Sequence, residues 1–237
     1  MLPGDCCGLG YKHASPEDGY KILRFHTGNG GMYKPRAEIY DLKYKTWTRL
    51  DFSWDWYVFK PYRGVSLNGN VYWIAAWNHV SKVFIQSFDF SVEKFEPLCS
   101  LPSTCVGSTF MALSDFRRDK PSLLQEREET FDIWVTSKIK KGVVISWTKL
   151  FSVPRPNLPV LHASSRHHVI ISPPVYFVDK NNRIVVCSEE QDMNYVCAKV
   201  YVIGFEKSIG LKNYRNGGIR WPSISGYAHL PSLVPVS

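Results

Sequence analysis

The chain has 237 residues, 44% of them hydrophobic and 21% charged, with a formal net charge of +8 at pH 7. This composition is that of a folded globular protein and excludes a disordered or low-complexity chain. The basic residues are scattered along the sequence, which favours a solvated surface over a nucleic-acid-binding patch.

The first 50 residues contain four short runs with the composition of β-strands, separated by turn-like and Gly-rich connections. The run YKILRF (20–25) alternates in a way that predicts the two faces of one strand. Together the four runs predict one antiparallel meander. The expected strands are 8–12, 20–25, 37–42 and 46–50.

The clearest four-strand unit lies between residues 63 and 98. Asn68-Gly69 is a pair that tolerates the positive φ angles of a type I′ turn, and β-branched and aromatic runs flank it, so we expect a tight hairpin. Two further runs follow polar, turn-like connections. The expected strands are 63–67, 71–75, 83–88 and 95–98.

The two units are repeats of each other. Three residues of the first unit each lie 48 positions before a counterpart in the second. An Asp at the end of a strand can cap the following turn through its side chain, and we expect the aromatic and leucine residues to pack inward. The matched residues are Asp41, Trp47 and Leu50 in the first unit and Asp89, Phe95 and Leu98 in the second.

The pattern continues more loosely through the rest of the chain. A third set of strands ends in Trp147 and Leu150, which lie 52 positions after Phe95 and Leu98, and a fourth set contains the turn DKNN (179–182). The third set is 108–113, 122–125, 130–135 and 146–151, and the fourth set is 167–172, 175–178, 183–188 and 199–205.

Four-strand units that repeat every roughly 40 to 50 residues predict an all-β fold. We expect a kelch-like β-propeller or partial propeller, a single domain over 1–237 in which each meander is one blade and 217–236 closes the ring. A two-sheet β-sandwich is the alternative fold. The approximate blades are 8–50, 63–98, 108–151 and 167–205.

The six cysteines form no C-x-x-C pair and no regular framework, which predicts free thiols in a reducing compartment. Cys187 and Cys197 could face each other across two strands, although buried free thiols are the preferred interpretation. The amino-terminal residues have no basic segment followed by an apolar run, and no apolar stretch approaches the roughly 18 residues of a membrane span. We therefore expect an intracellular protein of the nucleus and/or the cytoplasm.

The sequence contains none of the common catalytic or metal-binding motifs. The adjacent pair His167-His168 would point to opposite faces of a strand, so the histidines are expected to be ordinary strand or surface residues. Glu126, Glu128 and Glu129 form a charged connection that is better interpreted as a solvated turn than as an acid-base pair. We expect no enzyme activity, no catalytic residues, no metal and no cofactor.

Aromatic residues are the stronger functional clue. In a four-strand meander the connections between blades and those between the second and third strands emerge on one face, which predicts that 53–59 lies beside 77–79. Trp and Tyr are enriched at protein-binding hot spots, so we expect a partner-binding patch there. The alternative is that these rings fill gaps between blades. The expected partner-binding residues are Trp54, Trp56, Tyr57, Trp77 and His79.

Nine segments of the chain resemble, in order, those of the type 1 F-box-associated domain of plant F-box proteins. Jointly they are a specific signal that covers nearly the whole chain. The segments are GLGY (8–11), YKILRF (20–25), EIYDLKYKTWTRL (38–50), GVSLNGNVYWIA (64–75), SFDFSVEKFEPL (87–98), FDIWV (131–135), SWTKLFSV (146–153), YFVDKNNRIVVC (176–187) and SGYAHLPSLVPV (225–236).

The resemblance implies a kelch-like propeller that binds proteins without catalysis and serves as the substrate-recognition part of an SCF-type E3 ubiquitin ligase complex. It implies a protein substrate as partner, and neither nucleic acid nor membrane. No F-box segment precedes Gly8, so the Skp adaptor and cullin are expected only if an F-box lies upstream. The alternatives are a carbohydrate-binding or glycosidase-like propeller, whose Trp and Tyr side chains would stack on sugars, and a truncated non-functional fragment.

Overall fold

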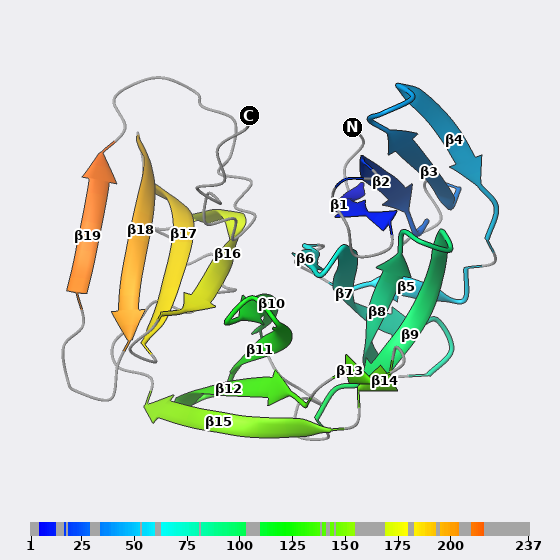
Figure 1. Ribbon diagram of the computed structural model, residues 1–237. Coiled ribbons are helices and arrows are strands. Elements are labelled where there is room, and N and C mark those ends of the chain that lie inside the picture. Colours follow the sequence, from blue (N-terminus) through cyan, green and yellow to red (C-terminus); the bar gives the residue numbers. More distant parts are fainter. Residues whose placement is uncertain are drawn as a thin grey trace.

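The structure is a computed structural model. It describes residues 5–12, 17, 19–28, 34–52, 54–59, 63–80, 82–102, 110–137, 139–140, 143–144, 146–154, 169–179, 183–192, 195–203 and 210–215. Within these residues the regular structure is made of antiparallel β-sheets, and four large sheets follow one another around an arc (Figure 1).

The first two sheets share the amino-terminal half of the chain. In the second sheet, β5 and β6 both pair with the same side of β7, so two short strands occupy one inner position. The first sheet contains β1 (Cys6–Tyr11), β2 (Tyr20–His26), β3 (Arg36–Asp41) and β4 (Thr46–Leu50). The second contains β5 (Trp56–Val58), β6 (Val65–Leu67), β7 (Asn70–Trp77), β8 (Val83–Asp89) and β9 (Lys94–Ser100).

The third and fourth sheets are also four-stranded, and a small two-stranded sheet lies in the connection within the third. The third sheet contains β10 (Phe110–Phe116), β11 (Lys120–Glu126), β12 (Thr130–Thr136) and β15 (Trp147–Pro154), and the small sheet is β13 (Ile139–Lys140) with β14 (Val143–Val144). The fourth sheet contains β16 (Val169–Val178), β17 (Ile184–Asp192), β18 (Tyr195–Ile203) and β19 (Gly210–Arg215).

Apolar clusters join each sheet to the next one along the chain. Phe25 and Trp73, both 0% exposed, lie in the cluster between the first and second sheets. Two further clusters join the second sheet to the third and the third to the fourth. Sheets that bury their faces against successive neighbours around an arc are blades, not the two facing layers of a sandwich. The prediction of an all-β, kelch-like propeller or partial propeller is therefore confirmed.

The strands of the fourth sheet differ from those expected. The sequence predicts separate strands at 167–172 and 175–178, but β16 runs through both, with register shifts on either side of Ser172. Pro173-Pro174 cannot donate to the ladder, and bulges absorb this interruption without ending the strand. The expected last strand, 199–205, overlaps β18, and β19 follows it. The expected closing segment 217–236 lies outside the described residues.

The capping role predicted for the repeated aspartates is confirmed. The Oδ1 of Asp41 accepts a hydrogen bond from the backbone N–H of Lys43 at 2.9 Å, and the Oδ1 of Asp89 accepts one from Ser91 at 2.7 Å. Each carboxylate thus holds the first residues of the turn that follows its strand. The same turn chemistry recurs in two consecutive sheets.

Leu98 and its counterpart in the third sheet, Leu150, share a role that spacing alone does not show. Leu98 and Leu150 are each the extra residue of a β-bulge, and one is 7% exposed whereas the other is 40% exposed. Inward packing is confirmed for Leu98. In the third sheet the bulge in β15 leaves Leu150 outside and turns the next residue, Phe151, toward the core. The flanking pairs are Ile85↔Cys99 and Gln86↔Pro97 in the second sheet, and Ile133↔Phe151 and Trp134↔Lys149 in the third.

Inward packing is wrong for Trp47, whose side chain is 49% exposed. Trp47 pairs with Tyr40, which lies on the opposite face of β3 from the buried Ile39. That face of the first sheet is turned away from the second sheet. The indole is covered there by the Arg24 guanidinium, 4.8 Å from the ring centroid.

Candidate functional site

The connection into the second sheet is tied to the end of β7. Asn78 donates from its backbone N–H to the Asp55 carbonyl at 2.8 Å and from its side-chain amide to the Trp54 carbonyl at 3.3 Å. Trp56 pairs with Trp77 in the β5–β7 ladder. The predicted neighbourhood of 53–59 and 77–79 is therefore confirmed for the residues that the structure describes.

Aromatic rings converge at this junction between the first and second sheets. The Trp54 centroid lies 5.2 Å from Trp56 and 5.3 Å from Phe95, and Phe52 lies 5.1 Å from Phe95. The same cluster reaches the first sheet, because Phe25 stacks on Trp54 at 6.0 Å. These rings bury a large apolar area at the contact of the two sheets.

The five expected partner-binding residues do not form one patch. Trp56 is 5% exposed, and Trp54 and Trp77 are half-buried against the cluster between the sheets. Tyr57 pairs with Ala76 and so lies on the other face of the second sheet, while His79 is exposed beyond the end of β7. The three tryptophans partly fill the space between blades, and their binding role stays a prediction.

A cavity of about 200 Å³ opens beside these tryptophans. We call it the aromatic cavity. It contains Trp54, Trp56 and Trp77 but neither Tyr57 nor His79. The described residues that line it are Phe52, Trp54, Asp55, Trp56, Trp77, Gln86, Phe95 and Pro97.

Sequence reasoning missed five of these lining residues. Phe95 carried a signal, since it belongs to the 48-residue repeat, but it was expected only to pack inward. Gln86 is a polar residue within the apolar run VFIQSFDF, yet β8 is buried on both faces, so alternation gave no indication of its environment. The lining residues that were missed are Phe52, Asp55, Gln86, Phe95 and Pro97.

Gln86 is a buried polar residue in the wall of the aromatic cavity. Its side chain is 1% exposed, and its Nε2 donates to the Ser87 carbonyl at 3.2 Å. Its Oε1 is buried and accepts no hydrogen bond from any described residue. Buried polar atoms are nearly always paired, so this acceptor marks a position at which a donor is missing.

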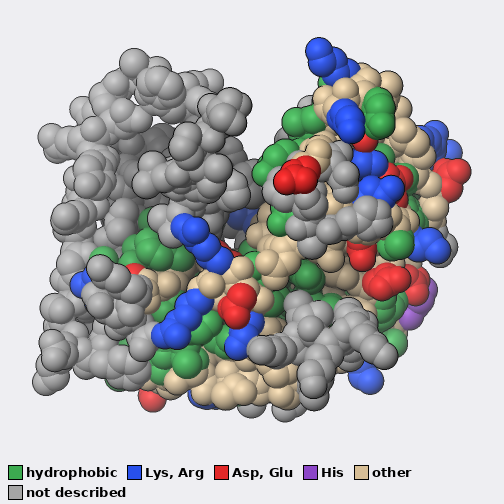
Figure 2. Space-filling model, in the orientation of Figure 1, with side chains coloured by type: hydrophobic (Ala, Val, Ile, Leu, Met, Phe, Trp, Pro, Cys, Tyr) green, Lys and Arg blue, Asp and Glu red, His purple; other side chains and the backbone are tan. Residues whose placement is uncertain are grey.

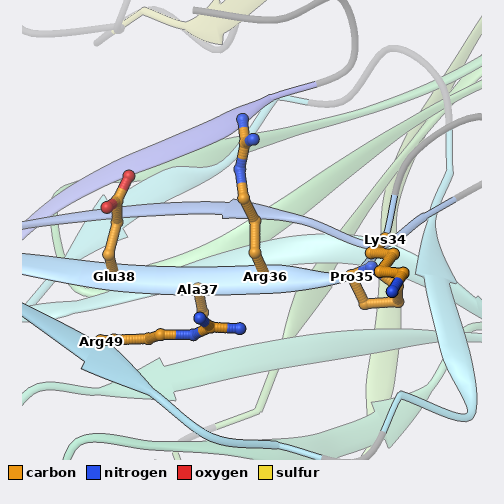
Figure 3. Close-up of a pocket in the computed structure, with 6 residues that line it drawn as sticks. All are labelled: Lys34, Pro35, Arg36, Ala37, Glu38 and Arg49. Carbon is orange, nitrogen blue, oxygen red and sulfur yellow. The ribbon is translucent and has the colours of Figure 1, made fainter.

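A second cavity, of about 310 Å³, lies on the outer strands of the first sheet (Figure 3). Arg36 and Glu38 project side by side from β3, and Arg49 comes from β4. Arg36 is paired with Asp5 at 2.9 Å, and Glu38 is paired with Arg24. Because Arg36 and Glu38 are neutralised by partners within the first sheet, this cavity is the weaker candidate.

The buried carboxylates of the third sheet do not converge. Glu126 and Asp132 are 0% and 1% exposed. Asp132 pairs with Gln125 across β11 and β12, whereas Glu126 pairs with Phe131, so the two carboxylates lie on opposite faces of the sheet. Burial raises the pKa of Asp132, but hydrogen bonds from Lys149 and Ser152 outweigh this and hold the pKa below its usual value. This arrangement does not provide an acid-base pair.

The cysteines that the structure describes in full are free thiols. Burial raises the pKa of Cys99 to about 12, so this thiol is protonated and unreactive at neutral pH. Cys187 pairs with Val200, and Cys197 pairs with Glu190, so these two cysteines are not partners in the β17–β18 register. The described residues include no cluster that could hold a metal and no helix long and apolar enough to cross a membrane. On the face in Figure 2, basic and acidic side chains are interspersed.

A family model and several relatives of similar sequence indicate the family of the chain. The family model described as the F-box associated beta propeller domain matches residues 3–236. The chain is 51% identical to the "F-box/WD-40 repeat-containing protein 1" of Arabidopsis thaliana, covering 98% of this chain and 58% of the relative. It is 37% identical to the "Putative F-box only protein 15" of the same plant, covering 98% of this chain and 62% of the relative.

The chain thus spans about three fifths of the length of these relatives. Among solved structures, an exo-beta-1,3-galactanase from Phanerochaete chrysosporium matches 82% of this chain and 46% of its own, with 10% identity and a TM-score of 0.38. A match at this level carries no argument about activity.

Proposed function

Because the chain belongs to the F-box associated beta propeller family, we propose that it is a protein-binding module that recognises substrates for an SCF-type ubiquitin ligase. The observation that carries this proposal is the aromatic cavity between the first two sheets, with three half-buried or buried tryptophans. Trp is the residue type most typical of protein-binding hot spots, which lie in well-packed and desolvated pockets.

The proposed assembly is modular. The relatives carry an F-box in their names, and the chain corresponds to about three fifths of their length. In a longer protein the F-box would contact the Skp adaptor and cullin, and this domain would hold the protein to be ubiquitinated without itself catalysing a reaction. Such a complex would act in the nucleus and/or the cytoplasm.

The carbohydrate alternative has less support. Ligand cavities for drug-sized molecules usually have about 300 to 1,000 Å³, and the aromatic cavity has about 200 Å³. A glycosidase also needs two carboxyl groups that converge on one bond, and the two buried carboxylates of the third sheet lie on opposite faces.

The test is a pull-down from plant extract in which the proteasome is inhibited, with the full chain as bait and mass spectrometry as the readout. We expect a discrete protein to be enriched by the wild-type chain and lost with Trp77→Ala. Trp77 lines the aromatic cavity and stacks on Phe84 at 4.5 Å, so its removal opens one wall.

Trp47→Ala is the matched control. Trp47 is as large and more exposed, but it lies on the opposite face of the first sheet, away from the aromatic cavity. The control should keep the captured protein. Equal recovery with Trp77→Ala and wild type, from baits with the same melting midpoint, would contradict the proposed site.

A further inference from the structure

We infer that the aromatic cavity receives a cationic side chain, Lys or Arg, of the bound protein. The inference rests on the proposed function and deepens it, because it names the chemistry that the site selects. It follows from an unpaired acceptor, the character of the walls, and a comparison between two blades of the same molecule.

The unpaired acceptor is the Oε1 of Gln86. The hydrogen bond from Nε2 to the Ser87 carbonyl fixes which end of the amide is nitrogen, so the atom without a partner among the described residues is the oxygen. Gln86 lines the aromatic cavity, and a buried acceptor without a partner favours a donor from the molecule that enters the cavity. Lysine and arginine side chains carry several N–H donors and no acceptor.

The walls favour positive charge. Trp54, Trp56 and Phe95 lie with centroids 5.2 to 5.3 Å apart and ring planes inclined by 53° to 60°. Aromatic faces carry negative potential and attract an ammonium or guanidinium group that comes to lie over them. Asp55 is the charged residue among the described lining residues, and it forms no ion pair with any described residue.

The third sheet contains the same position with its cation already in place. Gln86 and Pro97 directly follow the bulge in the second sheet, as Trp134 and Lys149 do in the third. The Lys149 ammonium lies 4.9 Å from the Trp134 ring centroid and 2.7 Å from the Asp132 Oδ2.

Both positions face the preceding sheet, and in the third sheet Lys149 supplies the ammonium there. Pro97 stands where Lys149 stands, so among the described lining residues the aromatic rings and the Asp55 carboxylate have no cation beside them. The volume of about 200 Å³ suits one side chain. The net charge of +8 works against cations at long range, so selection must come from the contact itself.

The test titrates two pentapeptides, Gly-Gly-Arg-Gly-Gly and Gly-Gly-Lys-Gly-Gly, into the full chain. The readout is the NMR shift of the indole N–H signals of Trp54, Trp56 and Trp77. The neutral controls replace Arg by citrulline and Lys by norleucine, which keep the shape and remove the charge. We expect saturable shifts with the cationic peptides and about ten-fold weaker binding of the neutral ones.

Two variants separate ligand recognition from packing. Gln86→Met removes the unpaired acceptor at similar volume, so it should weaken the cationic peptides while leaving the melting midpoint equal or higher. Pro97→Lys should place an ammonium in the aromatic cavity, as Lys149 does in the third sheet, and so compete with the peptides. Pro97→Gln fills the same position without the charge, so it should bind the peptides more tightly than Pro97→Lys does.

Three results would overturn the inference. The first is equal binding of the cationic and neutral peptides. The second is saturation of the indole shifts by methyl β-D-galactoside or by a Trp-containing pentapeptide and not by the cationic peptides. The third is no shift with any peptide, together with a Gln86→Met variant that is more stable than the wild type. The last result would mean a packing void. If Trp77→Ala loses the captured protein but Pro97→Lys keeps it, the proposed function stands and only the cation inference fails.

Discussion

Asp132 has three charged or polar partners on the third sheet although its side chain is 1% exposed. Lys149 lies 2.7 Å from its Oδ2 and Arg127 lies 3.6 Å away, and Ser152 donates to its Oδ1. Burial alone would favour the protonated acid, but these donors favour the carboxylate, so its pKa lies below the usual value. The carboxylate therefore stabilises the fold only while it is ionised.

We expect Asp132→Asn to lower the free energy of unfolding at pH 7 by about 2 kcal/mol, because it removes charge-assisted hydrogen bonds. A folded-state pKa below the unfolded value, about 3.9, means that this stabilisation is present above that pH and is lost as the pH falls through the folded pKa. Urea unfolding at pH 7 and pH 3 measures it. The difference between wild type and variant should shrink at pH 3, and a constant difference would contradict this account.

At the residue scale, two residues of the same type can also differ in their exposure. Trp56 is 5% exposed at the junction of the first two sheets, whereas Trp47 is 49% exposed on the face of the first sheet that is turned away from it. The sequence identified the aromatic character of the site and three of its tryptophans. It could not identify Gln86, because an unpaired acceptor is defined by the surrounding atoms and not by its neighbours in the chain.

At the scale of elements, two hairpin turns use different residues for two consecutive positive φ angles. Asn68 and Gly69 have φ angles of 51° and 81°, which confirms the predicted type I′ turn. Arg117 and Arg118 occupy the corresponding turn of the third sheet with φ angles of 52° and 61°. Positive φ is unfavourable for a residue with a Cβ. The Arg117-Arg118 turn therefore stores strain at both residues, whereas the Asn68-Gly69 turn avoids it at its glycine.

Replacing the second turn by the first should relieve this strain. We expect Arg117→Asn with Arg118→Gly to raise the free energy of unfolding by about 1 kcal/mol, after the loss of the Arg117 contact with the Phe116 ring. Urea unfolding of the double variant and the wild type at pH 7 provides the measurement. A decrease in stability would mean that the arginines make a compensating contact.

At the scale of the whole molecule, the first two sheets are joined by close backbone contacts as well as by rings. Tyr11 donates from its N–H to the Gly69 carbonyl at 3.1 Å, and Ser66 donates to the Leu9 carbonyl at 2.8 Å. A Cβ added at Gly10 would lie 2.3 Å from the Gly69 oxygen. The strand β1 therefore docks onto the β6–β7 hairpin only because residue 10 has no side chain.

We expect Gly10→Ala to lower the free energy of unfolding by about 2 kcal/mol, because a backbone oxygen cannot move aside cheaply. Gly8→Ala in the same strand is the matched control. Its Cβ would meet the Val71 side chain at 2.9 Å, and a side chain can yield more easily, so the loss should be smaller. Denaturant unfolding of both variants measures the difference, and equal losses would show that the sheet contact is not specific to Gly10.

The sequence by itself determined the four-strand period, the chemistry of the capped turns and the family of the chain. These features are local or repeat at a fixed spacing, so they can be read without knowing which faces meet. Only the tertiary structure decided the placement of Trp56 in the ladder with Trp77, the bulges at Leu98 and Leu150, and the unpaired Oε1 of Gln86. One extra residue in a strand exchanges the side chains that face inward with those that face outward. The residues that line the aromatic cavity were therefore selected by the packing between blades and not by composition.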